Sequence, residues 1–274
     1  MTVGLSETKN ASIMVMSGTK DAYDLIKRLS QLNKYTILAT TTTNYGAKIA
    51  KDSGADEVIE GGLNQEEIEQ LLRNNNILVV IDATHPFASN ATKNAIKATN
   101  KEKIRYIRFE RPELEKIENK HVYSAKSFEK VVEIVLNLLE SSSGYNKIMY
   151  LAGVSNLEYL LKKIDKNQVY VRVLPSIDSI KRCLDIGLKP ENIIAMQGTF
   201  SKEFNQALMK EYEVSIIITK ESGLTGGTPS KISAALDLGL DVVIVERPEI
   251  TELAKEKVFK DINPLIDYLI NKMD

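Results

Sequence analysis

The feature that most constrains the fold is a regular alternation of short apolar runs with segments of helical period. The apolar runs of the first half include "SIMVMSG", "YTILATTTT" and "ILVVIDATHPFA", and helical patterns such as "TKDAYDLIKRLS" follow them. Strands that alternate with helices in this way pair in parallel and are covered by helices on both faces of the sheet. The sequence therefore predicts an α/β chain built on parallel sheets.

The chain also repeats itself. The tetrapeptide "ERPE" occurs at Glu110–Glu113 and again at Glu246–Glu249, in each case after an apolar run. "IMVMSG" near the start matches "IMYLAG" at Ile148, and "HVYSAKSFEKVVEIV" is echoed by "KVFKDINPLIDYLI". Because these matching segments occur in the same order in both halves, they predict two similar units, residues 1–140 and 147–274. The units are expected to join near the Ser-Ser-Ser-Gly stretch. Two such units are expected to leave a ligand cleft between them.

Composition excludes several classes of protein. The 274 residues carry a net charge of −1, which provides no overall field for nucleic acid or for an anionic membrane. Cys183 is the only cysteine, so an intrachain disulfide and a cysteine-rich metal site are both excluded. The first residues lack the apolar core of a signal peptide, and no apolar run approaches the roughly 18 residues of a membrane span. We expect a cytoplasmic protein.

The loop "TKESGLTGGTPSKI" (Thr219–Ile232) lies between an expected strand and an expected helix. Its glycines allow positive φ and a close approach of the backbone to a ligand, and the helix start that follows favours an anion. The residues that we expect to form an anion cradle, most simply for a pyrophosphate, are Lys220, Ser222, Gly223, Gly226, Gly227, Thr228 and Lys231. The alternative is a flexible turn without a ligand, and the loop matches neither GxxxxGK[ST] nor GxGxxG.

The matching loop of the first half, "DATHPFASNATKN", has other chemistry. It offers Asp82, Thr84 and His85 where the second half has glycines. An imidazole at a strand end, with an acid three residues earlier, suits a proton donor or a ligand contact. A metal ligand is disfavoured because no second histidine or cysteine stands at ligand spacing. A purely structural histidine is the remaining alternative.

Three other loops follow expected strands. In "SGTKD", Gly18 permits a bend, and Ser17 and Thr19 offer hydroxyls that either contact a ligand or cap the next helix. Thr42, within "TTTTN" after the second strand, has the same two interpretations. Arg172 lies near the end of the corresponding strand of the second half, where nucleotide-binding sheets meet the ribose, and it suits a 2′-phosphate.

Arginines end the fifth expected strand of each half. Arg108 and Arg111 lie in "RFERP", and Arg247 lies in the second "ERP". Each can hold a substrate carboxylate through two parallel hydrogen bonds, or can form a structural pair with a nearby glutamate.

Taken together, "VIDATHPFASNATKNA", "YIRFERP", "QGTFSKEFNQALM" and the stretch from "ITKESGLTGGTPSKI" to "VERP" resemble the precorrin-6A reductases of cobalamin biosynthesis. The resemblance covers nearly the whole chain. The family pattern "TKxSG…GGTxxK" falls on Thr219 to Lys231, and "DATHPFA" falls on Asp82 to Ala88. The opening pattern, usually Gly-Gly-Thr-x-Glu, reads Ser17-Gly18-Thr19-Lys20-Asp21 here, which departs from it at two positions.

The resemblance implies two Rossmann-like domains with NADH or NADPH in the cleft. The reaction it implies is hydride transfer to precorrin-6A or cobalt-precorrin-6A, a polycarboxylate macrocycle, which gives the 6B form. His85 is then the first candidate for the proton donor, with Asp82 or solvent as rivals. Ser17, Gly18, Thr19, Thr42, Thr84, Arg108 and Arg111 would contact the substrate.

Two other functions remain open at this stage, a tetrapyrrole methyltransferase and a two-domain protein that binds an anionic ligand without chemistry. A methyltransferase would be expected to have an acidic ribose-binding residue beside a glycine-rich first turn, and this chain lacks one. The binding protein would leave NADH and NADPH unoxidised. We expect a monomer or a homodimer that binds neither nucleic acid nor membrane.

Overall fold

The computed structural model describes residues 11–141, 146–223 and 226–273, and it forms two compact units. The first unit comprises Met1–Pro112 and Glu249–Asp274, and the second comprises Glu113–Pro248. Each unit contains one six-stranded sheet in which every pair of neighbouring strands is parallel. The expected α/β fold with parallel sheets is therefore confirmed.

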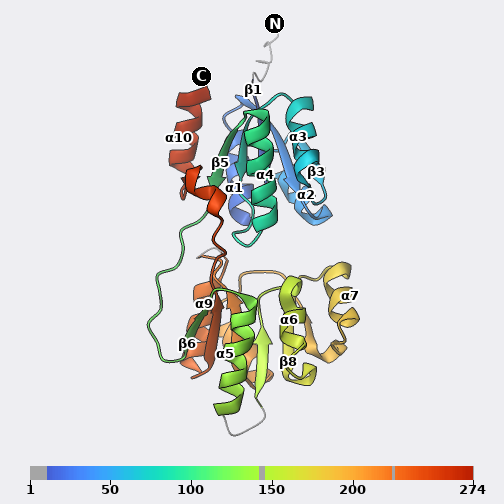
Figure 1. Ribbon diagram of the computed structural model, residues 1–274, viewed down its shortest axis with the longest axis vertical. Helices are drawn as coiled ribbons and strands as arrows, with labels where there is room; N and C mark the ends of the chain where they lie inside the picture. The colour runs from blue at the N-terminus through green and yellow to red at the C-terminus, as the bar shows by residue number, and fades with distance from the viewer. Residues whose placement is uncertain (1–10, 142–145, 224–225, 274) are drawn as a thin grey trace, which may run out of the picture. The chain divides into compact units, whose positions relative to one another are not determined.

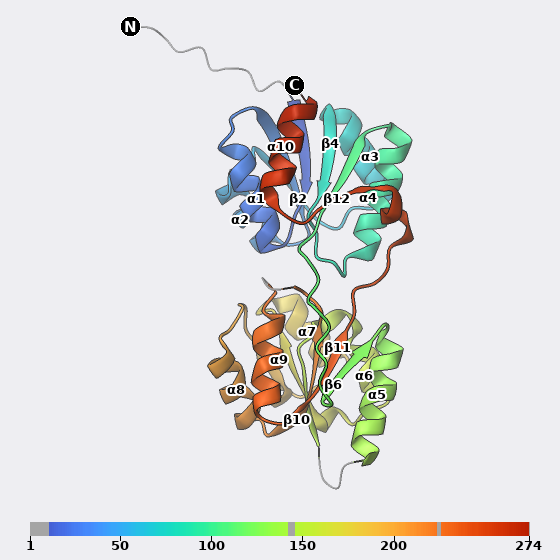
Figure 2. The ribbon, with the colours of Figure 1, turned by 90° about the vertical axis from the view of Figure 1, so that its left-hand side faces the viewer.

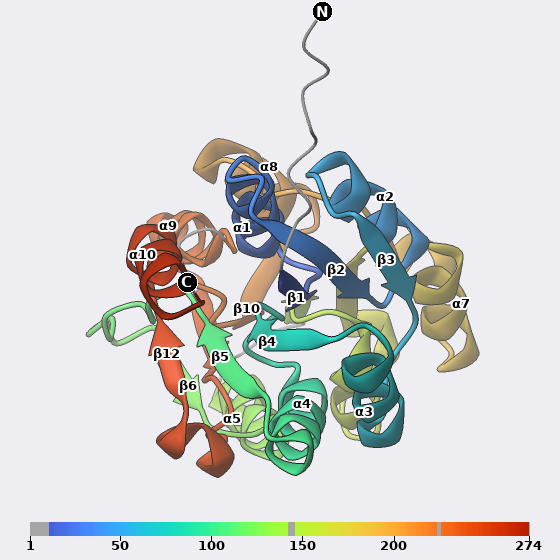
Figure 3. The ribbon, with the colours of Figure 1, turned by 90° about the horizontal axis from the view of Figure 1, so that it is seen from above.

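The first sheet has the order β3-β2-β1-β4-β5-β12, which Figure 3 shows from above. Its strands are β1 (Ala11–Met16), β2 (Tyr35–Thr41), β3 (Glu57–Glu60), β4 (Ile77–Asp82), β5 (Arg105–Phe109) and β12 (Lys257–Phe259). The helices of this unit are α1 (Lys20–Ser30), α2 (Asn44–Asp52), α3 (Gln65–Asn74), α4 (Ser89–Glu102), α10 (Ile262–Met273) and the short 3₁₀ helix η4 (Thr251–Lys255).

The second sheet has the equivalent order β9-β8-β7-β10-β11-β6. Its strands are β6 (Val122–Ala125), β7 (Lys147–Tyr150), β8 (Val169–Val173), β9 (Ile193–Ala195), β10 (Val214–Lys220) and β11 (Asp241–Val245). The helices are α5 (Phe128–Ser141), α6 (Leu157–Leu161), α7 (Ile177–Asp185), α8 (Lys202–Glu211), α9 (Thr228–Asp237) and the 3₁₀ helices η1 (Val154–Asn156), η2 (Lys166–Gln168) and η3 (Pro190–Asn192).

Helices cover both faces of each sheet (Figure 2). In the first unit, buried side chains of α1 and α10 pack on one face, and those of α3 and α4 pack on the other. In the second unit, α8 and α9 share a core with β7, β10 and β11. Central strands such as β4 are buried on both faces, which explains why their sequences are continuous apolar runs rather than alternating ones.

The strand that completes each sheet comes from the other half of the repeat. β6 follows the first "ERPE" but pairs with β11, and β12 follows the second "ERPE" but pairs with β5. The chain therefore passes from the first unit to the second after β5 and returns after β11 (Figure 1). With this exchange, both sheets have the strand order 3-2-1-4-5-6 of doubly wound nucleotide-binding folds.

The division of the chain thus differs from the expected boundaries, 1–140 and 147–274. Residues 113–141 belong to the second unit, and residues 249–274 belong to the first. The reason is that the two segments after "ERPE" resemble each other, so either one can extend either sheet without changing the local pattern. The expected linker lies partly outside the described residues, at 142–145. The expected cleft between the units stays a prediction.

The order of the strands fixes where a ligand can bind within each unit. The order reverses between β1 and β4 in the first sheet and between β7 and β10 in the second. Ligands of such sheets bind outside the carboxyl ends of the strands at this reversal. The loops after β1, β4, β7 and β10 are therefore the ones to examine.

No helix among the described residues has both the length and the apolar character that a membrane span requires.

Two buried tyrosines allow a test of the core. The hydroxyl of Tyr150, at the end of β7, is fully buried and has no hydrogen-bond partner among the described residues, whereas Tyr106 donates to Asp82 at 2.7 Å. Tyr150→Phe removes an unsatisfied polar atom, so we expect the free energy of unfolding to stay constant or to rise by about 1 kcal/mol. Tyr106→Phe should lower it by about 1 to 3 kcal/mol. Urea denaturation of both variants measures the difference, and equal losses would contradict this account.

Candidate functional site

The first unit presents two loops at its strand-order reversal. Thr19 begins α1 and joins these loops, because its hydroxyl accepts from Ala22 N at 3.1 Å and donates to the carbonyl of Ala83 at 3.0 Å. The hydroxyl of Ser17 donates to the carbonyl of Thr40 at 2.9 Å. Both hydroxyls are buried and are used within the protein. Gly18 has a φ of 113°, which only glycine adopts readily.

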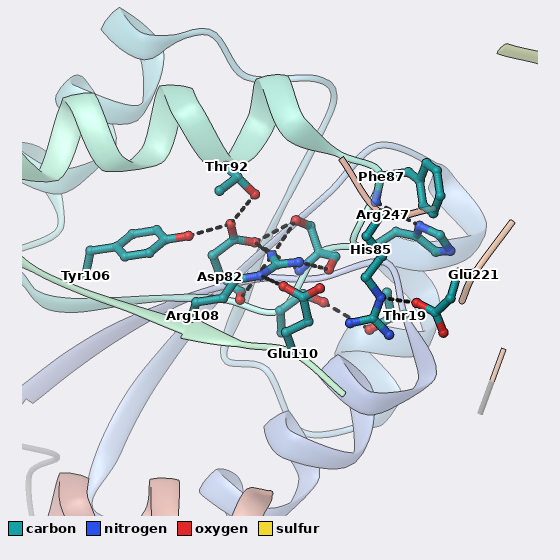
Figure 4. Close-up of polar contacts among 12 residues, drawn as sticks. Thr19, Asp82, His85, Phe87, Thr92, Tyr106, Arg108, Glu110, Glu221 and Arg247 are labelled. Carbon is teal, nitrogen blue, oxygen red and sulfur yellow. Dashed lines mark hydrogen bonds and ion pairs between the residues drawn. The ribbon is translucent and has the colours of Figure 1, made fainter. Parts of the chain in front are cut away.

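Asp82 ends β4 and is the centre of a buried polar network (Figure 4). Its Oδ1 accepts from the backbone and the hydroxyl of Thr84 at 3.0 and 2.6 Å and pairs with Arg108 at 2.8 Å. Its Oδ2 accepts from Thr92 and Tyr106, each at 2.7 Å. Both carboxylate oxygens are thus saturated with donors, and the side chain is 0% exposed.

Arg108 is held just as completely. It donates to the hydroxyl and the carbonyl of Thr84, both at 3.1 Å, and its Nε donates to Glu110 at 2.9 Å. Its side chain is 1% exposed, so the guanidinium faces the protein and has no surface for a substrate carboxylate. The structural pair with a glutamate, one of the two alternatives for this arginine, is the one that the structure contains.

Electrostatics keeps this network charged. Burial raises the pKa of the Asp82 carboxyl, but the Arg108 charge and the hydrogen bonds from Thr84 and Thr92 outweigh it and hold the pKa below its usual range. Burial lowers the pKa of Arg108, but Asp82 and Glu110 more than compensate. A carboxylate that stays ionised, fully buried and fully bonded is not suited to deliver a proton, so the expectation of Asp82 as an alternative proton donor has no support in the geometry.

His85 lies in the loop that this network supports. It is partly exposed, and its ring lies 5.7 Å from that of Phe87. The backbone N–H of Phe87 donates to Nδ1 at 3.2 Å, and the carbonyl of His85 accepts from Ala88 N at 2.8 Å. Because Nδ1 accepts a hydrogen bond, the neutral ring carries its proton on Nε2.

A narrow crevice, too small to admit a water molecule, lies beside this loop. It is lined by Thr19, Asp21, Ala83, Thr84, Pro86, Phe109, Glu110 and Arg111. Arg111 pairs with Asp21 at 2.5 Å, and both side chains are largely buried. Thr42 is exposed one residue after β2, whereas the neighbouring Thr43 caps α2 by accepting from Gly46 N at 3.1 Å. The structure thus brings Thr19, Thr84 and Arg111 together and leaves Thr42 apart from this crevice.

The glycine loop of the second unit folds back onto the end of β10. The hydroxyl of Thr228 accepts from Ser222 N and donates to the carbonyl of Lys220, both at 3.1 Å. A Cβ at Gly226 would lie 2.3 Å from the Cβ of Ser222, so no other residue fits there. Gly227 has a φ of 69° and begins α9 without a side-chain cap. The first amides of α9 therefore point out of the helix without an intrahelical acceptor.

Two cations lie beside this helix start. Lys231 is 8% exposed and donates to the carbonyl of Gly226 at 3.3 Å. Arg172 donates to Asn205 at 3.2 Å and lies 5.0 Å above the ring of Phe200. Among the residues that the structure describes, neither cation forms an ion pair with a carboxylate. This is unusual, because buried charges are normally paired.

The pKa values of Lys231 and Arg172 are both lowered by burial, because neither is paired with an acid among the described residues. Burial, and then the charge of Arg172, lower the pKa of Lys231 to about 8. Burial also lowers the pKa of Arg172. Two positive charges that destabilise each other in one partly dry site are suited to an anionic ligand, which would relieve both effects.

The other members of the expected cradle have different roles. Lys220 lies 5.7 Å from the ring of Phe128, and burial lowers its pKa. The amide of Gly223 already donates to Oε1 of Glu221 at 2.9 Å, so its use as an anion donor is not supported in this conformation. Gly223 is required instead for its φ of 70°.

Sequence reasoning missed several residues of these sites, namely Asp21, Thr92, Tyr106, Phe200, Asn205 and Glu221. Their contacts join residues distant in the chain, as when Asn205 of α8 accepts from Arg172 of β8. No local pattern reveals such contacts. Among the described residues there is no group of three or more His, Cys, Asp or Glu side chains that could hold a metal ion.

Comparison with known proteins identifies the family. The family model described as "Precorrin-6x reductase CbiJ/CobK" matches residues 12–270. The chain belongs to this precorrin-6x reductase family. It is 42% identical to the cobalt-precorrin-6A reductase of Methanothermobacter thermautotrophicus, covering 96% of this chain and 85% of that one. It is 39% identical to the cobalt-precorrin-6A reductase of Methanocaldococcus jannaschii, covering 95% and 98% of the two chains.

A solved structure has the same fold. The chain is similar to that of the CobK precorrin-6A reductase with a TM-score of 0.73, over 96% of this chain and 97% of that one, at 18% identity. The resemblance inferred from the sequence motifs is therefore confirmed. Members of this family are oxidoreductases that act on a CH–CH bond, which favours the reductase over the binding protein and the methyltransferase.

The Asp82 network generates a prediction about stability. Asp82→Asn leaves the buried Arg108 without its counter-ion, so we expect the free energy of unfolding at pH 7 to fall by about 3 to 5 kcal/mol. Because the folded pKa of Asp82 is lowered, the stability it contributes is complete above its unfolded pKa of about 4 and is lost as the pH falls through the folded value. The variant should therefore lose less stability than the parent on acidification below pH 4. Urea denaturation at several pH values measures both effects.

The control is Asp185→Asn, which removes an exposed pair with Lys181 on α7. This change should cost no more than about 0.5 kcal/mol. Equal losses of unfolding free energy in the two variants would show that the Asp82 network stabilises the fold no more than an exposed ion pair does.

Proposed function

We propose that this protein reduces cobalt-precorrin-6A to the 6B form, with NADPH as the hydride source, and that the second unit binds the dinucleotide. The observation that carries the cofactor assignment is the buried Lys231 and the partly buried Arg172 beside the uncapped start of α9. The cobalt form of the substrate is supported by the relatives at 42% and 39% identity, both named cobalt-precorrin-6A reductase.

Phosphate is the anion that best fits the second unit. The amides at the start of α9 offer donors and a partial positive charge. Gly226 is needed because a Cβ there would collide with Ser222, and Gly227 because of its φ of 69°. Lys231 supplies a point charge at the same place. We assign the pyrophosphate to this helix start, together with the side chains of Ser222 and Thr228 that fold the loop.

Arg172 supports NADPH rather than NADH. It lies near the end of β8, the second strand of the sheet, where the ribose of a dinucleotide binds in this fold. A guanidinium at this position attracts a 2′-phosphate, whereas an acid would hydrogen-bond a 2′-hydroxyl. Asn205 and Phe200 hold Arg172 in place, so it would be preorganised for this contact.

The bound dinucleotide supplies a hydride, and one proton completes the reduction. The protein has to align the acceptor and exclude water, which requires no nucleophile or metal. In the first unit, His85 and Thr84 lie at the loop after β4, and Thr19 and Arg111 lie at the crevice beside it. We assign the macrocycle to this loop region. Asp82 and Arg108 then have a structural role, because they hold the loop in place.

A biosynthetic reductase of this type is expected to work in the cytoplasm.

His85 is proposed to contact the macrocycle as a neutral Nε2–H donor. Proton delivery would first require an imidazolium, whose Nδ1–H would face the N–H of Phe87 and repel it. The observed conformation therefore favours the orienting role over the acid role, and the proton would then come from solvent.

Dinucleotide binding should depend on pH through Lys231. This amine has a pKa of about 8 in the free protein, and a bound phosphate raises it. Above pH 8, binding must therefore take up a proton, and we expect the affinity for NADP⁺ to fall about fivefold between pH 8 and pH 9. Calorimetric titration in two buffers of different ionisation enthalpy measures both the affinity and the proton uptake.

Lys231→Arg is the matched control, because arginine stays charged and should remove most of this pH dependence. NADP⁺ should bind more tightly than NAD⁺ at every pH. A parent protein whose affinity for NADP⁺ is the same at pH 7 and pH 9 would exclude Lys231 from the phosphate site.

Substitution of His85 distinguishes its two possible roles. His85→Ala should lower kcat by roughly tenfold to a hundredfold and leave the NADPH affinity unchanged. His85→Gln retains an N–H donor near the position of Nε2 but cannot supply a proton, so it should recover most of the rate if His85 orients the substrate. NADPH oxidation, followed with the macrocycle present, provides both rates. A Gln variant as slow as the Ala variant, without the acid limb of the pH profile, would indicate a proton donor instead.

A further inference from the structure

Glu221 is an acid placed directly in the proposed nucleotide loop, one residue after β10. A carboxylate beside a phosphate site is unfavourable by itself, since like charges repel. The family motif "TKxSG" leaves this position open, and the sequence alone assigns it no role. Its contacts in the structure explain how the charge is accommodated.

The carboxylate of Glu221 joins three segments of the second unit. Its Oε2 pairs with Arg247, which follows β11 in the second "ERP" (Figure 4). Its Oε1 accepts from the backbone N–H of Gly223 at 2.9 Å, inside the glycine loop. The same oxygen accepts from Leu114 N at 3.3 Å, in the segment that leads to β6.

Burial makes this pair rigid. The side chains of Glu221 and Arg247 are only 12% and 8% exposed. The carboxylate is therefore neutralised by Arg247 and turned toward the amides, rather than toward a ligand. A hydrogen bond from an N–H to an ionised acceptor is about twice as strong as a neutral one, so the Gly223 contact holds the loop firmly.

The repeat provides a comparison within the same chain. Arg111, in the first "ERP", pairs with Asp21 in the first turn of α1, at 2.5 Å. Both arginines therefore bind an acid near the strand-order reversal of their own unit, but the acids belong to different loops. Only in the second unit is the acid itself part of the glycine loop.

We propose that Glu221 and Arg247 are positioning residues for the dinucleotide. The pair sets the conformation of residues 221–223 and thereby places the amides of Gly226, Gly227 and Thr228 for the phosphates. Arg247 then serves as a structural anchor of the nucleotide loop and not as a ligand of a substrate carboxylate. This inference rests on the proposed binding of the dinucleotide by this loop.

The charge of the pair is essential to this role. Glu221→Gln keeps an oxygen for the Gly223 amide but removes the carboxylate charge that pairs with Arg247. The neutral amide would hold both Arg247 and the Gly223 N–H more weakly, and the loop would lose its fixed conformation. Loss of one hydrogen bond from a backbone amide to a charged phosphate costs roughly tenfold or more in affinity, so we expect the KM for NADPH to rise at least about tenfold. The kcat at saturating NADPH should change less than about twofold, because the reacting groups are intact.

The experiment compares four variants by NADP⁺ affinity, NADPH kinetics and thermal unfolding. Glu221→Gln and Arg247→Lys test the pair, and Gly226→Ala tests the loop itself. Glu69→Gln is the control, because Glu69 is also buried and paired, with Lys101 at 2.6 Å, but lies on α3 of the first unit. We expect Glu69→Gln to lower thermal stability without changing the affinity for NADP⁺.

The outcomes separate this inference from the proposed function. Weak NADP⁺ binding in Gly226→Ala, Glu221→Gln and Arg247→Lys, with normal binding in Glu69→Gln, supports both. Weak binding in Gly226→Ala alone overturns the positioning role but keeps the nucleotide loop. Unchanged binding in Gly226→Ala overturns the nucleotide loop itself. If Glu221→Gln does not fold, Glu221→Asp and Arg247→Lys test the pair instead: both retain its charges, but each changes the reach of its side chain and so misplaces the carboxylate relative to the Gly223 amide. Parental NADP⁺ affinity in both would overturn the positioning role.

Discussion

The exchange of the sixth strand is the constraint on which the rest of the structure depends. β12 pairs with β5 and β6 pairs with β11, so each unit is completed by a segment that follows the other unit's "ERPE". A parallel sheet needs both faces covered and its edges protected, and here α10 and α5 arrive together with the exchanged strands. The sixth strand of each sheet is present only because of this pairing, and it covers the edge of β5 in one unit and of β11 in the other.

The two units carry different residues at the ends of their fourth strands, so the two ligand-binding edges differ in chemistry. At the end of its fourth strand the first unit has Asp82, and the second has Lys220. Asp82 requires a buried counter-charge, and Arg108 of the neighbouring strand provides it. The resulting network supports a loop that carries an imidazole. The described residues of the second unit contain no such network, and its loop is instead held by Thr228, by close glycine packing and by Glu221. Its remaining charges, Lys231 and Arg172, suit an anion.

The sequence predicts much of this fold and part of the site. Alternating runs and matched echoes identify nearly every strand, because buried parallel strands are continuous apolar segments. The same echoes place the domain boundary incorrectly, since the pattern of a strand does not specify its partner. The glycine loop and His85 are visible because rare residue types stand at strand ends. The burial of Arg108 and the neighbours of Arg172 are not visible, because they depend on contacts between side chains far apart in the chain.

The arrangement of the strands has a consequence for synthesis of the protein. β5 ends at Phe109, but its partner β12 begins only at Lys257, after every strand of the second sheet. The N-terminal sheet therefore stays one strand short while the whole second sheet is made and leaves the ribosome. During that time the open edge of β5 is exposed to unwanted pairing with other chains. The fold thus ties completion of its first sheet to a strand that is translated after the whole second sheet, and a chain that terminates before β12 cannot yield an intact first sheet.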